Sequence, residues 1–174
     1  MSECFFCELI QKKANLLYED EKVVAMLAPD PVALGHIVVL PRVHAPIIEA
    51  VPDFVAADMF KVANKVSTVI FDALGAAGTN VLIQNGPPAG QRHNHAMVSV
   101  IPRAEGDNLQ IGWQPKPADE GVLGKMEGQI KDEAKNVGVF EREKAKPIEQ
   151  AKPVEVSKES AKGDERIKRL RRIP

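Results

Sequence analysis

The sequence has few aromatic residues, almost no net charge and no long apolar run. Aromatic residues make up 5% of its 174 residues, so the core must be mainly aliphatic. The formal net charge of -1 gives the whole molecule no bias toward nucleic acid. No run of about 18 apolar residues is present to span a membrane, and the start lacks the basic-then-apolar layout of a secretory signal. We therefore expect a cytoplasmic protein with one domain and an extension.

Cysteine is also scarce, and its spacing is informative. The two cysteines, Cys4 and Cys7, form a Cys-x-x-Cys pair near the start of the chain. A disulfide across so short a loop is one interpretation. In a reducing compartment, such a pair is more often a metal clip or a redox pair.

Residues 78–103 carry the strongest functional pattern. Asn80 to Gln84 favours a strand, residues 85–90 have the glycines and prolines of a turn, and Arg92 to Ile101 alternates as a second strand. Alternate side chains of a strand share a face, and a polar face with two histidines is costly to bury without partners. This pattern indicates a site, with Arg92 pointing away from it. The site face would carry His93, His95, Met97, Ser99 and Ile101, and the opposite face Arg92, Asn94, Ala96, Val98 and Val100.

The rest of the first 136 residues predicts a mixture of helices and strands. A short helix follows Cys7, residues 16–20 and 22–27 form a hairpin, and residues 36–40 form a β-branched strand. Residues 53–74 have apolar side chains at helical spacing and end at Gly75. Residues 118–136 predict a weaker helix, because each of its glycines costs about 1 kcal/mol relative to alanine.

Beyond residue 137 the composition changes, and we expect an extended tail over residues 137–174. Two similar Lys-Pro segments, at residues 146–149 and 152–155, favour a stiff and extended chain. The last ten residues combine basic side chains with Ile167, Leu170 and Ile173 at a spacing of three. This end supports an alternative role as a protein or nucleic-acid interaction module, with nucleic acid the less favoured partner.

Four stretches, taken in order, resemble the histidine-triad (HIT) superfamily. They are Cys4-Phe-Phe-Cys7, the Gly-His to Pro-Arg-Val-His segment of residues 35–44, residues 80–91, and Val100-Ile-Pro-Arg103 followed by Trp113. The resemblance covers residues 1–136. It implies an α+β fold, with an antiparallel five-stranded sheet, one long helix packed on that sheet, and a homodimer.

In this family, three alternating histidines lie between a Gly-Gln pair and an apolar-Pro-Arg end. The register from Gln91 to Arg103 puts His95, Met97 and Ser99 at these three positions. The resemblance assigns the central position to the nucleophile that accepts the nucleotidyl group, and the third to phosphate binding. A thioether has no basic nitrogen and no proton to donate, so Met97 cannot form the phosphoramidate intermediate.

The resemblance also implies a pocket for a nucleotide-like or other small ligand. Gln84 matches a family position near the phosphates. Ala28 stands eight residues before His36, where the family carries an acid or Asn that holds the ribose. His36 itself is more often structural in the family. The pocket residues expected on this basis are Ala28, Gln84, Gln91, His93, Met97 and Ser99.

Some branches of the family bind zinc through two N-terminal cysteines, a histidine after the Pro-Arg turn and the first triad histidine. The matching residues here are Cys4, Cys7, His44 and His95. Two thiolates and two imidazoles make a closed structural site, without an open position at which the metal could activate water.

Two interpretations of the chemistry stay open. In the first, the chain has lost the usual HIT hydrolase reaction and binds a nucleotide-like or other small ligand, and any other chemistry would depend on His93, Ser99 or a bound water. In the second, it is an active nucleotide phosphohydrolase or nucleotidyl transferase in which His93, with Ser99, replaces the lost histidine. The histidine pattern would then be read two residues earlier, as His93-x-His95-x-Met97, which moves the reacting group by about 6 to 7 Å at ~3.3 Å per strand residue.

Overall fold

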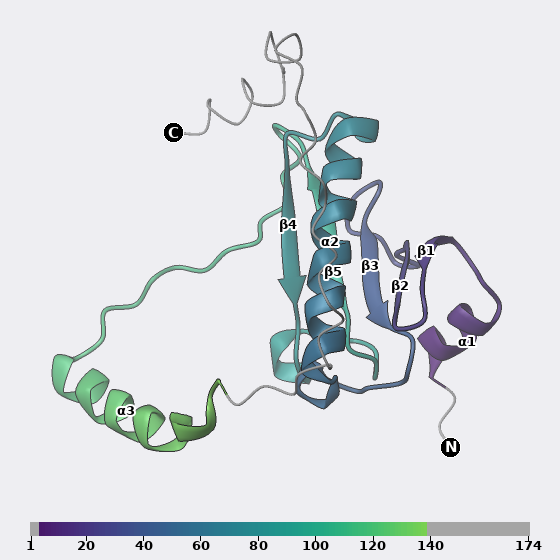
Figure 1. Ribbon diagram of the computed structural model, residues 1–174. Helices are drawn as coiled ribbons and strands as arrows, with labels where there is room; N and C mark the ends of the chain where they lie inside the picture. Colours follow the sequence, from purple (N-terminus) through teal and green to yellow (C-terminus); the bar gives the residue numbers. More distant parts are fainter. Residues whose placement is uncertain (1–3, 139–174) are drawn as a thin grey trace, which may run out of the picture. The chain divides into compact units, whose positions relative to one another are not determined.

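The computed structural model describes residues 4–138, which form the α+β fold expected from the sequence (Figure 1). One five-stranded sheet has the strand order β1-β2-β3-β5-β4, and every neighbouring pair is antiparallel. The predictions for the Lys-Pro segments and the basic end lie outside the described residues. The elements are α1 (Phe5–Gln11), β1 (Leu16–Glu19), β2 (Val23–Leu27), β3 (Ile37–Pro41), α2 (Asp53–Leu74), β4 (Gly78–Ile83), β5 (Val98–Arg103) and α3 (Glu120–Glu133).

Helix α2 packs on one face of the sheet, and its bounds are those predicted from the spacing of its apolar residues. Met59, Ala63 and Ile70 are buried on this side, in a core that includes the inward side chains of β2, β3 and β5. Gly75 ends the helix in the left-handed conformation, with a φ of 64°. Glycine adopts this conformation without a Cβ penalty, which gives the helix its sharp end.

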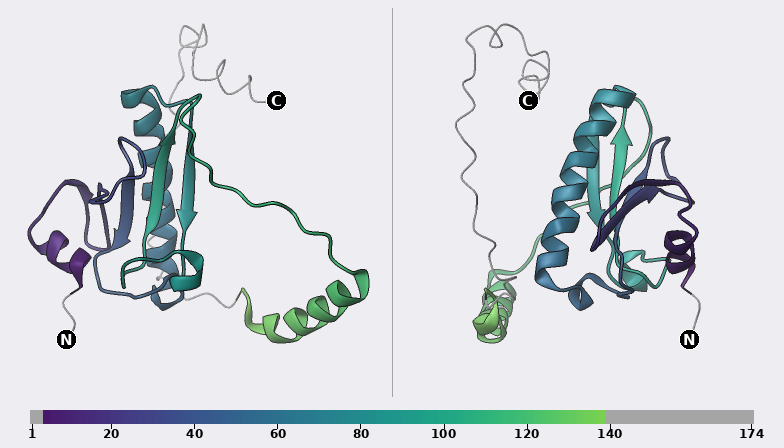
Figure 2. Two further views of the ribbon diagram at one scale, coloured as in Figure 1. Left: turned by 180° about the vertical axis from the view of Figure 1, so that it is seen from behind. Right: turned by 45° about the vertical axis from the view of Figure 1, so that its right-hand side comes forward.

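The short helix α1 lies on the opposite side of the sheet from α2 (Figure 2). Its buried side chains, Phe6 and Ile10, pack against Met26, Val38 and Leu40. Fully burying a side chain of this kind contributes about 1.5 to 3 kcal/mol. Because β2 and β3 are covered on both faces, their sequences are apolar runs and do not alternate.

The strand predicted for residues 92–101 is wrong in its first half. Strand β5 begins at Val98, and residues 91–97 form a loop without ladder pairing. The backbone N–H of His95 donates to the carbonyl of His93 at 2.9 Å, and that of Ala96 donates to the carbonyl of Ala45 at 2.6 Å. Both N–H groups donate to carbonyls outside the sheet, so they cannot pair with a neighbouring strand. The segment therefore turns away from the strand direction.

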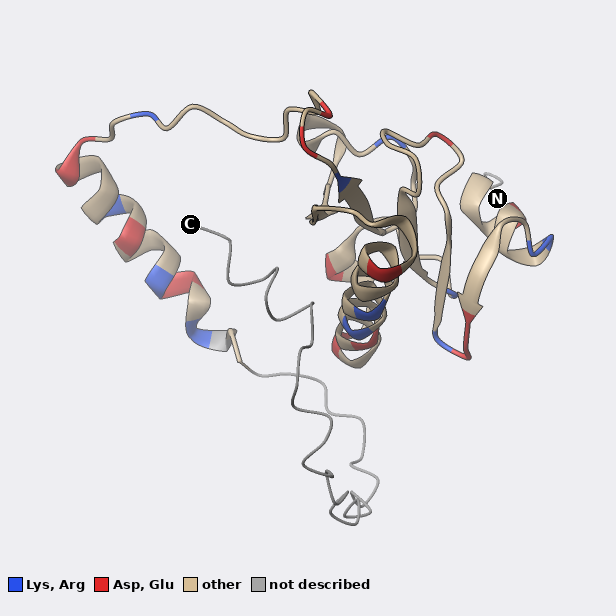
Figure 3. Ribbon diagram, turned by 90° about the horizontal axis from the view of Figure 1, so that it is seen from above, with Lys and Arg blue, Asp and Glu red and all other residues tan. Residues whose placement is uncertain are grey.

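Helix α3 confirms the weaker helix expected near residues 118–136, and residues 104–119 before it form no helix or strand. Asp119 caps its start by accepting a hydrogen bond from the Val122 N–H at 3.0 Å. Acidic and basic side chains alternate along it (Figure 3), and Lys131 pairs with Glu127 at 2.5 Å. None of its residues is buried. Within the described part of the chain, no helix is long and apolar enough to cross a membrane.

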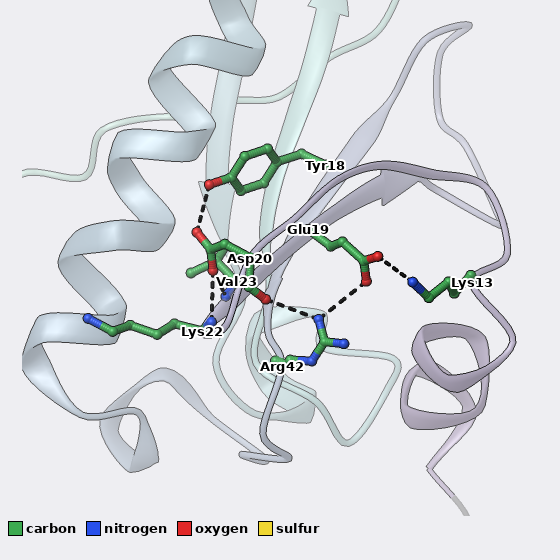
Figure 4. A network of polar contacts seen from close by, with 7 residues as sticks. All are labelled: Lys13, Tyr18, Glu19, Asp20, Lys22, Val23 and Arg42. Atoms are coloured by element: carbon green, nitrogen blue, oxygen red, sulfur yellow. Dashed lines mark hydrogen bonds and ion pairs between the residues drawn. The ribbon is translucent and has the colours of Figure 1, made fainter.

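A polar network centred on Asp20 closes the turn between β1 and β2 (Figure 4). Its Oδ1 accepts hydrogen bonds from the backbone N–H groups of Lys22 and Val23, both at 2.7 Å, and its Oδ2 accepts one from the Tyr18 hydroxyl at 2.7 Å. Burial raises the pKa of Asp20, but the hydrogen bonds from Tyr18, Lys22 and Val23 outweigh it, so the pKa lies below its ordinary value.

Replacing Asp20 by Ala is expected to lower the free energy of unfolding by about 1 to 2 kcal/mol, because two backbone donors lose their acceptor. A depressed pKa adds stability above about pH 4 that is lost as the pH falls through the folded-state pKa. The wild type should therefore lose part of its advantage over D20A as the pH falls below about 4. Urea denaturation across this range measures both effects. The adjacent, exposed Glu21 is the control, and a loss as large in E21A would contradict the assignment.

Candidate functional site

Four candidate metal ligands from three separate segments converge in the structure. Cys4 precedes α1, Cys7 lies within it, His44 follows β3, and His95 precedes β5. One ligand atom from each residue lies within 4.8 Å of those of the others. Cys4 Sγ is 3.5 Å from His95 Nδ1, and Cys7 Sγ is 3.5 Å from His44 Nδ1 and 3.7 Å from His95 Nδ1. The fold thus brings together the four residues that the resemblance implied.

These separations fit a single tetrahedral zinc ion. With Zn–S bonds of about 2.3 Å and Zn–N bonds of about 2.1 Å, tetrahedral geometry separates sulfur and nitrogen ligands by about 3.6 Å. Both cysteines are free thiols, so their sulfur atoms are available to a metal. The donor set of two sulfurs and two nitrogens is typical of structural zinc sites.

The backbone holds His95 in the orientation that a metal ligand needs. Its ring is fully buried, and its Nε2–H donates to the carbonyl of Pro41 at 3.0 Å. This bond leaves Nδ1 as the lone-pair nitrogen facing the cysteines. Burial lowers the pKa of His95, which favours the neutral ring. Burial raises the pKa of the Cys7 thiol, and a bound cation would counter this by favouring the thiolate.

The four candidate ligands Cys4, Cys7, His44 and His95 together form a metal-type cluster. A cavity of about 280 Å³ lies beside this cluster, and Phe6 of α1 forms part of the cavity wall. Its lining mixes apolar side chains such as Phe6 and Val38 with polar ones, as small-molecule sites commonly do. Its volume is near the lower end for such sites, which suits a compact ligand. Each of the six expected pocket residues contributes to this lining: Ala28, Gln84, Gln91, His93, Met97 and Ser99.

His36 gives the cavity an unsatisfied polar atom. The side chain lines the cavity and is 8% exposed. Its Nδ1 accepts a hydrogen bond from the Val32 N–H at 3.4 Å, so the neutral ring carries its proton on Nε2. Burial lowers the pKa of His36, which favours this neutral form. Nε2 is itself buried and has no hydrogen-bond partner among residues 4–138, so the cavity wall holds one buried donor without an acceptor.

Gln91 has its amide fully engaged with the protein. Its Oε1 accepts a hydrogen bond from the Gly86 N–H at 2.6 Å, and its Nε2 donates to the carbonyls of Pro46 at 2.6 Å and His93 at 2.9 Å. Both amide hydrogens are used in this way. Gln91 therefore ties the 91–97 loop to the backbone of Pro46 and Gly86, whereas the sequence predicted that it contacts a ligand.

Several residues that line the cavity were not among the six expected from the sequence, Arg92 and Phe6 among them. Arg92 was expected to point away from the site, and this is wrong because it lines the cavity. The error has the same origin as the misplaced strand, since strand alternation does not apply to a loop. Phe6 was not considered as a cavity residue, although its position between Cys4 and Cys7 could have revealed it. A side chain between two ligands of one ion must lie close to that ion.

Gln84 lies directly against Gly90. A Cβ atom at Gly90 would lie 2.4 Å from Gln84 Nε2, and the φ of Gly90 is +90°. Only glycine leaves room for the Gln84 amide here, and only glycine adopts this backbone conformation without strain.

Replacing Gly90 by Ala is expected to destabilise the protein by about 1 to 3 kcal/mol through backbone strain, and to displace the Gln84 amide from the cavity. Thermal denaturation and the chemical shift of the Gln84 side-chain amide measure these two effects. Gly112 has open space around its Cβ position and no positive φ, so G112A is the matched control. Equal behaviour of G90A and G112A would contradict the assigned role of Gly90.

Comparison with known proteins identifies the fold family. Residues 10–106, more than half of the chain, match the HIT domain. The chain belongs to the HIT family. The family assignment that rested on four short stretches is thereby confirmed, as is the five-stranded antiparallel sheet that came with it.

This HIT-domain protein is similar to proteins of several kinds. It is 34% identical over 110 residues to adenylylsulfatase HINT3 of Arabidopsis thaliana; the match covers 62% of this chain and 56% of the plant protein. It is 29% identical to adenosine 5'-monophosphoramidase HNT1 of Candida albicans, over 78% of this chain and 94% of the fungal one. A zinc-bound HIT family protein of Mycobacterium smegmatis superposes with a TM-score of 0.59 at 29% identity, over 76% of this chain and 97% of that one.

Proposed function

We propose that this HIT-domain protein is a zinc-stabilised binding protein for a nucleotide-like small molecule, and that it lacks the usual histidine nucleophile. The observation that carries the proposal is the composition of the cavity. Met97 lines it at the position assigned to the nucleophile, beside Ser99, Gln84 and the unsatisfied Nε2 of His36. Such a cavity offers hydrogen bonds and apolar contact, but its central side chain has no nucleophilic nitrogen.

Zinc is supported by the donor set and by the relatives. Two thiols and two imidazoles lie at separations that suit one tetrahedral ion, and a zinc-bound family member has the same fold. Cys4, Cys7, His44 and His95 would hold the ion, and all four positions would then be filled by protein. The ion would contribute structural stability, by tying the start of the chain to the loop before β5.

A nucleotide-like ligand is supported by the relatives and by the polar end of the cavity. Two curated relatives carry names that denote action on adenylyl or adenosine monophosphate compounds. Arg92 brings a positive charge to the lining, and Gln84 and Ser99 bring neutral hydrogen-bonding groups. Ala28 lines the cavity without a carboxylate, but Asp30, two residues further along, brings one to the same lining. We therefore propose a ligand that carries both an anionic phosphate, which suits Arg92, and hydroxyl groups, which suit Asp30.

The alternative in which His93 acts as nucleophile has less support. His93 lines the same cavity as Met97, which is the observation in its favour. However, its ring stacks on Phe5 and meets the edge of Phe6, and no hydrogen bond orients the ring among the residues the structure describes. A nucleophilic or basic histidine normally depends on such an orienting partner.

Three measurements on the purified wild-type protein test the proposal. Metal analysis after purification without chelator should give about one zinc per chain. Calorimetric titration with AMP should show binding. A separate activity assay should show no turnover of adenosine phosphoramidate or of a dinucleoside polyphosphate. Turnover that is abolished in H93A would support the alternative instead. Sedimentation analysis checks the homodimer that the resemblance implies, which stays a prediction.

A further inference from the structure

The metal-type cluster and the cavity share two short segments of the chain. Phe5 and Phe6 are the two residues between Cys4 and Cys7. On the other side, His93 lies two residues before His95, in the loop that precedes β5. Cys4, Cys7 and His95 therefore each lie within two residues of Phe6 or His93, which line the cavity.

The contacts between these segments are direct. The ring of His93 stacks on Phe5 at a centroid distance of 5.3 Å and an interplanar angle of 18°, and it meets the edge of Phe6 at 5.0 Å. Phe6 also meets the ring of His95 edge-on at 6.2 Å. Of these residues, Phe6 and His93 line the cavity. Three aromatic contacts thus join the cavity wall to a candidate metal ligand.

The backbone around His93 continues this connection. The carbonyl of His93 accepts hydrogen bonds from the His95 N–H at 2.9 Å and from Gln91 Nε2 at 2.9 Å. Gln91, His93 and His95 are therefore coupled within one loop, and the first two of them line the cavity. The position of His95 in the cluster helps to fix the position of the loop.

Helix α1 depends on this anchoring more than the rest of the fold does. It is 7 residues long, and no side chain caps its start. A helix this short is not stable by itself, so its position must come from tertiary contacts. Those contacts are the buried side chains of Phe6 and Ile10 and, when a metal is bound, the bonds from Cys4 and Cys7 to the ion.

We propose that metal binding shapes the ligand cavity, so that the metal site and the cavity are thermodynamically linked. This inference rests on the proposed zinc site. The ion fixes Cys4 and Cys7 on either side of Phe5 and Phe6, and it fixes His95 beside His93. Phe6 and His93 then form an ordered wall of the cavity. By reciprocity, a molecule that fills the cavity strengthens the hold on the metal.

The methionine side chains provide probes for this linkage. Met97 lines the cavity, whereas Met59 is buried in the separate core beneath α2. In protein labelled with ¹³C at the methionine methyl groups, adding zinc to metal-free protein is expected to shift and sharpen the Met97 signal. The Met59 signal should stay unchanged. AMP should bind about fivefold or more tightly to the zinc form than to the metal-free form.

Phe5→Ala separates the linkage from metal binding itself. Phe5 is 44% exposed, so its ring can be removed at little cost to the core, and it is not a metal ligand. In F5A, zinc should bind with an affinity within about twofold of the wild type, while the response of Met97 to zinc falls by at least about half. Phe60 on α2 is 49% exposed, and F60A is the matched control in which the response should persist.

The outcomes are distinct. If zinc binds and leaves the Met97 signal unchanged, the two sites are independent and the inference is wrong. If Met59 responds as strongly as Met97, zinc acts by folding the whole domain, and the local linkage is also wrong. If no zinc binds at all, the proposed function fails together with the inference. A loss of the response in F60A equal to that in F5A would remove Phe5 from the connection.

Discussion

Removing the proposed zinc ion is expected to lower the melting temperature of the protein by about 10 to 15 °C. A ligand present at about 1,000 times its Kd stabilises the folded state by about 4 kcal/mol, and a domain of this size loses about 3 °C per kcal/mol. The loss arises because the cysteines and histidines come from three separate segments, which only the folded chain brings together. Differential scanning calorimetry with and without a chelator measures it.

Substitution of single ligands sharpens this prediction. Cys7→Ser should melt at the temperature of the chelated wild type and should respond little to added zinc. Glu8→Gln is the matched control, because Glu8 is the next residue of the same helix and its side chain makes an exposed ion pair with Lys12 at 3.3 Å. Such a pair contributes about 1 kcal/mol or less. A chelator that leaves the wild type unchanged would refute structural metal at this cluster.

Replacing Met97 and Ser99 together by His is expected to create adenosine phosphoramidate hydrolysis at a rate at least about 100-fold above that of the wild type. The reason is chemical, since a positioned imidazole can attack phosphorus and transfer protons, and such groups typically contribute 100-fold or more. Both side chains line the cavity, and both are partly exposed, so imidazoles there keep access to water. Release of ammonia or of AMP measures the gain.

Met97→Leu provides the control for this experiment. Leucine keeps the apolar character and roughly the volume of methionine, so it should leave both AMP binding and the absence of turnover unchanged. If the wild type already hydrolyses the substrate and M97L does so equally well, the reaction does not depend on this position. Loss of that activity in H93A would then assign it to His93.

The pattern of apolar residues correctly predicted the elements in which local preference and tertiary packing agree. The bounds of α2 are those read from helical spacing and the stop at Gly75, because the same side chains that favour the helix also face the sheet. The β1–β2 hairpin follows for a similar reason. The predicted ends of β3 and β4 differ from the observed ones by one or two residues, since strand ends depend on the pairing partner.

The error in residues 92–97 has a clear physical origin. Their alternation of polar and apolar residues is typical of a strand, yet the backbone donors of His95 and Ala96 bond to carbonyls outside the ladder. The side chain of Gln91 holds the same loop through three hydrogen bonds. The bonds to the carbonyls of Ala45 and Pro46 join distant parts of the chain, so they do not appear in a local pattern, and here they outweighed it. As a consequence, Arg92 joined the cavity instead of facing away from it.

The sequence by itself determined the family and the α+β class, and it predicted a candidate site of two cysteines and a histidine-rich motif with Met97 at its centre. Spacing and side-chain chemistry are local properties, so a single chain displays them. Only the tertiary structure decided that Phe6 and His93 lie between the metal-type cluster and the cavity. It also decided that the Gln91 amide bonds to the backbone of the protein, and that Nε2 of His36 has no hydrogen-bond partner among the described residues. Those features depend on which distant segments meet, and the packing of α1 and the 91–97 loop against the sheet decides that.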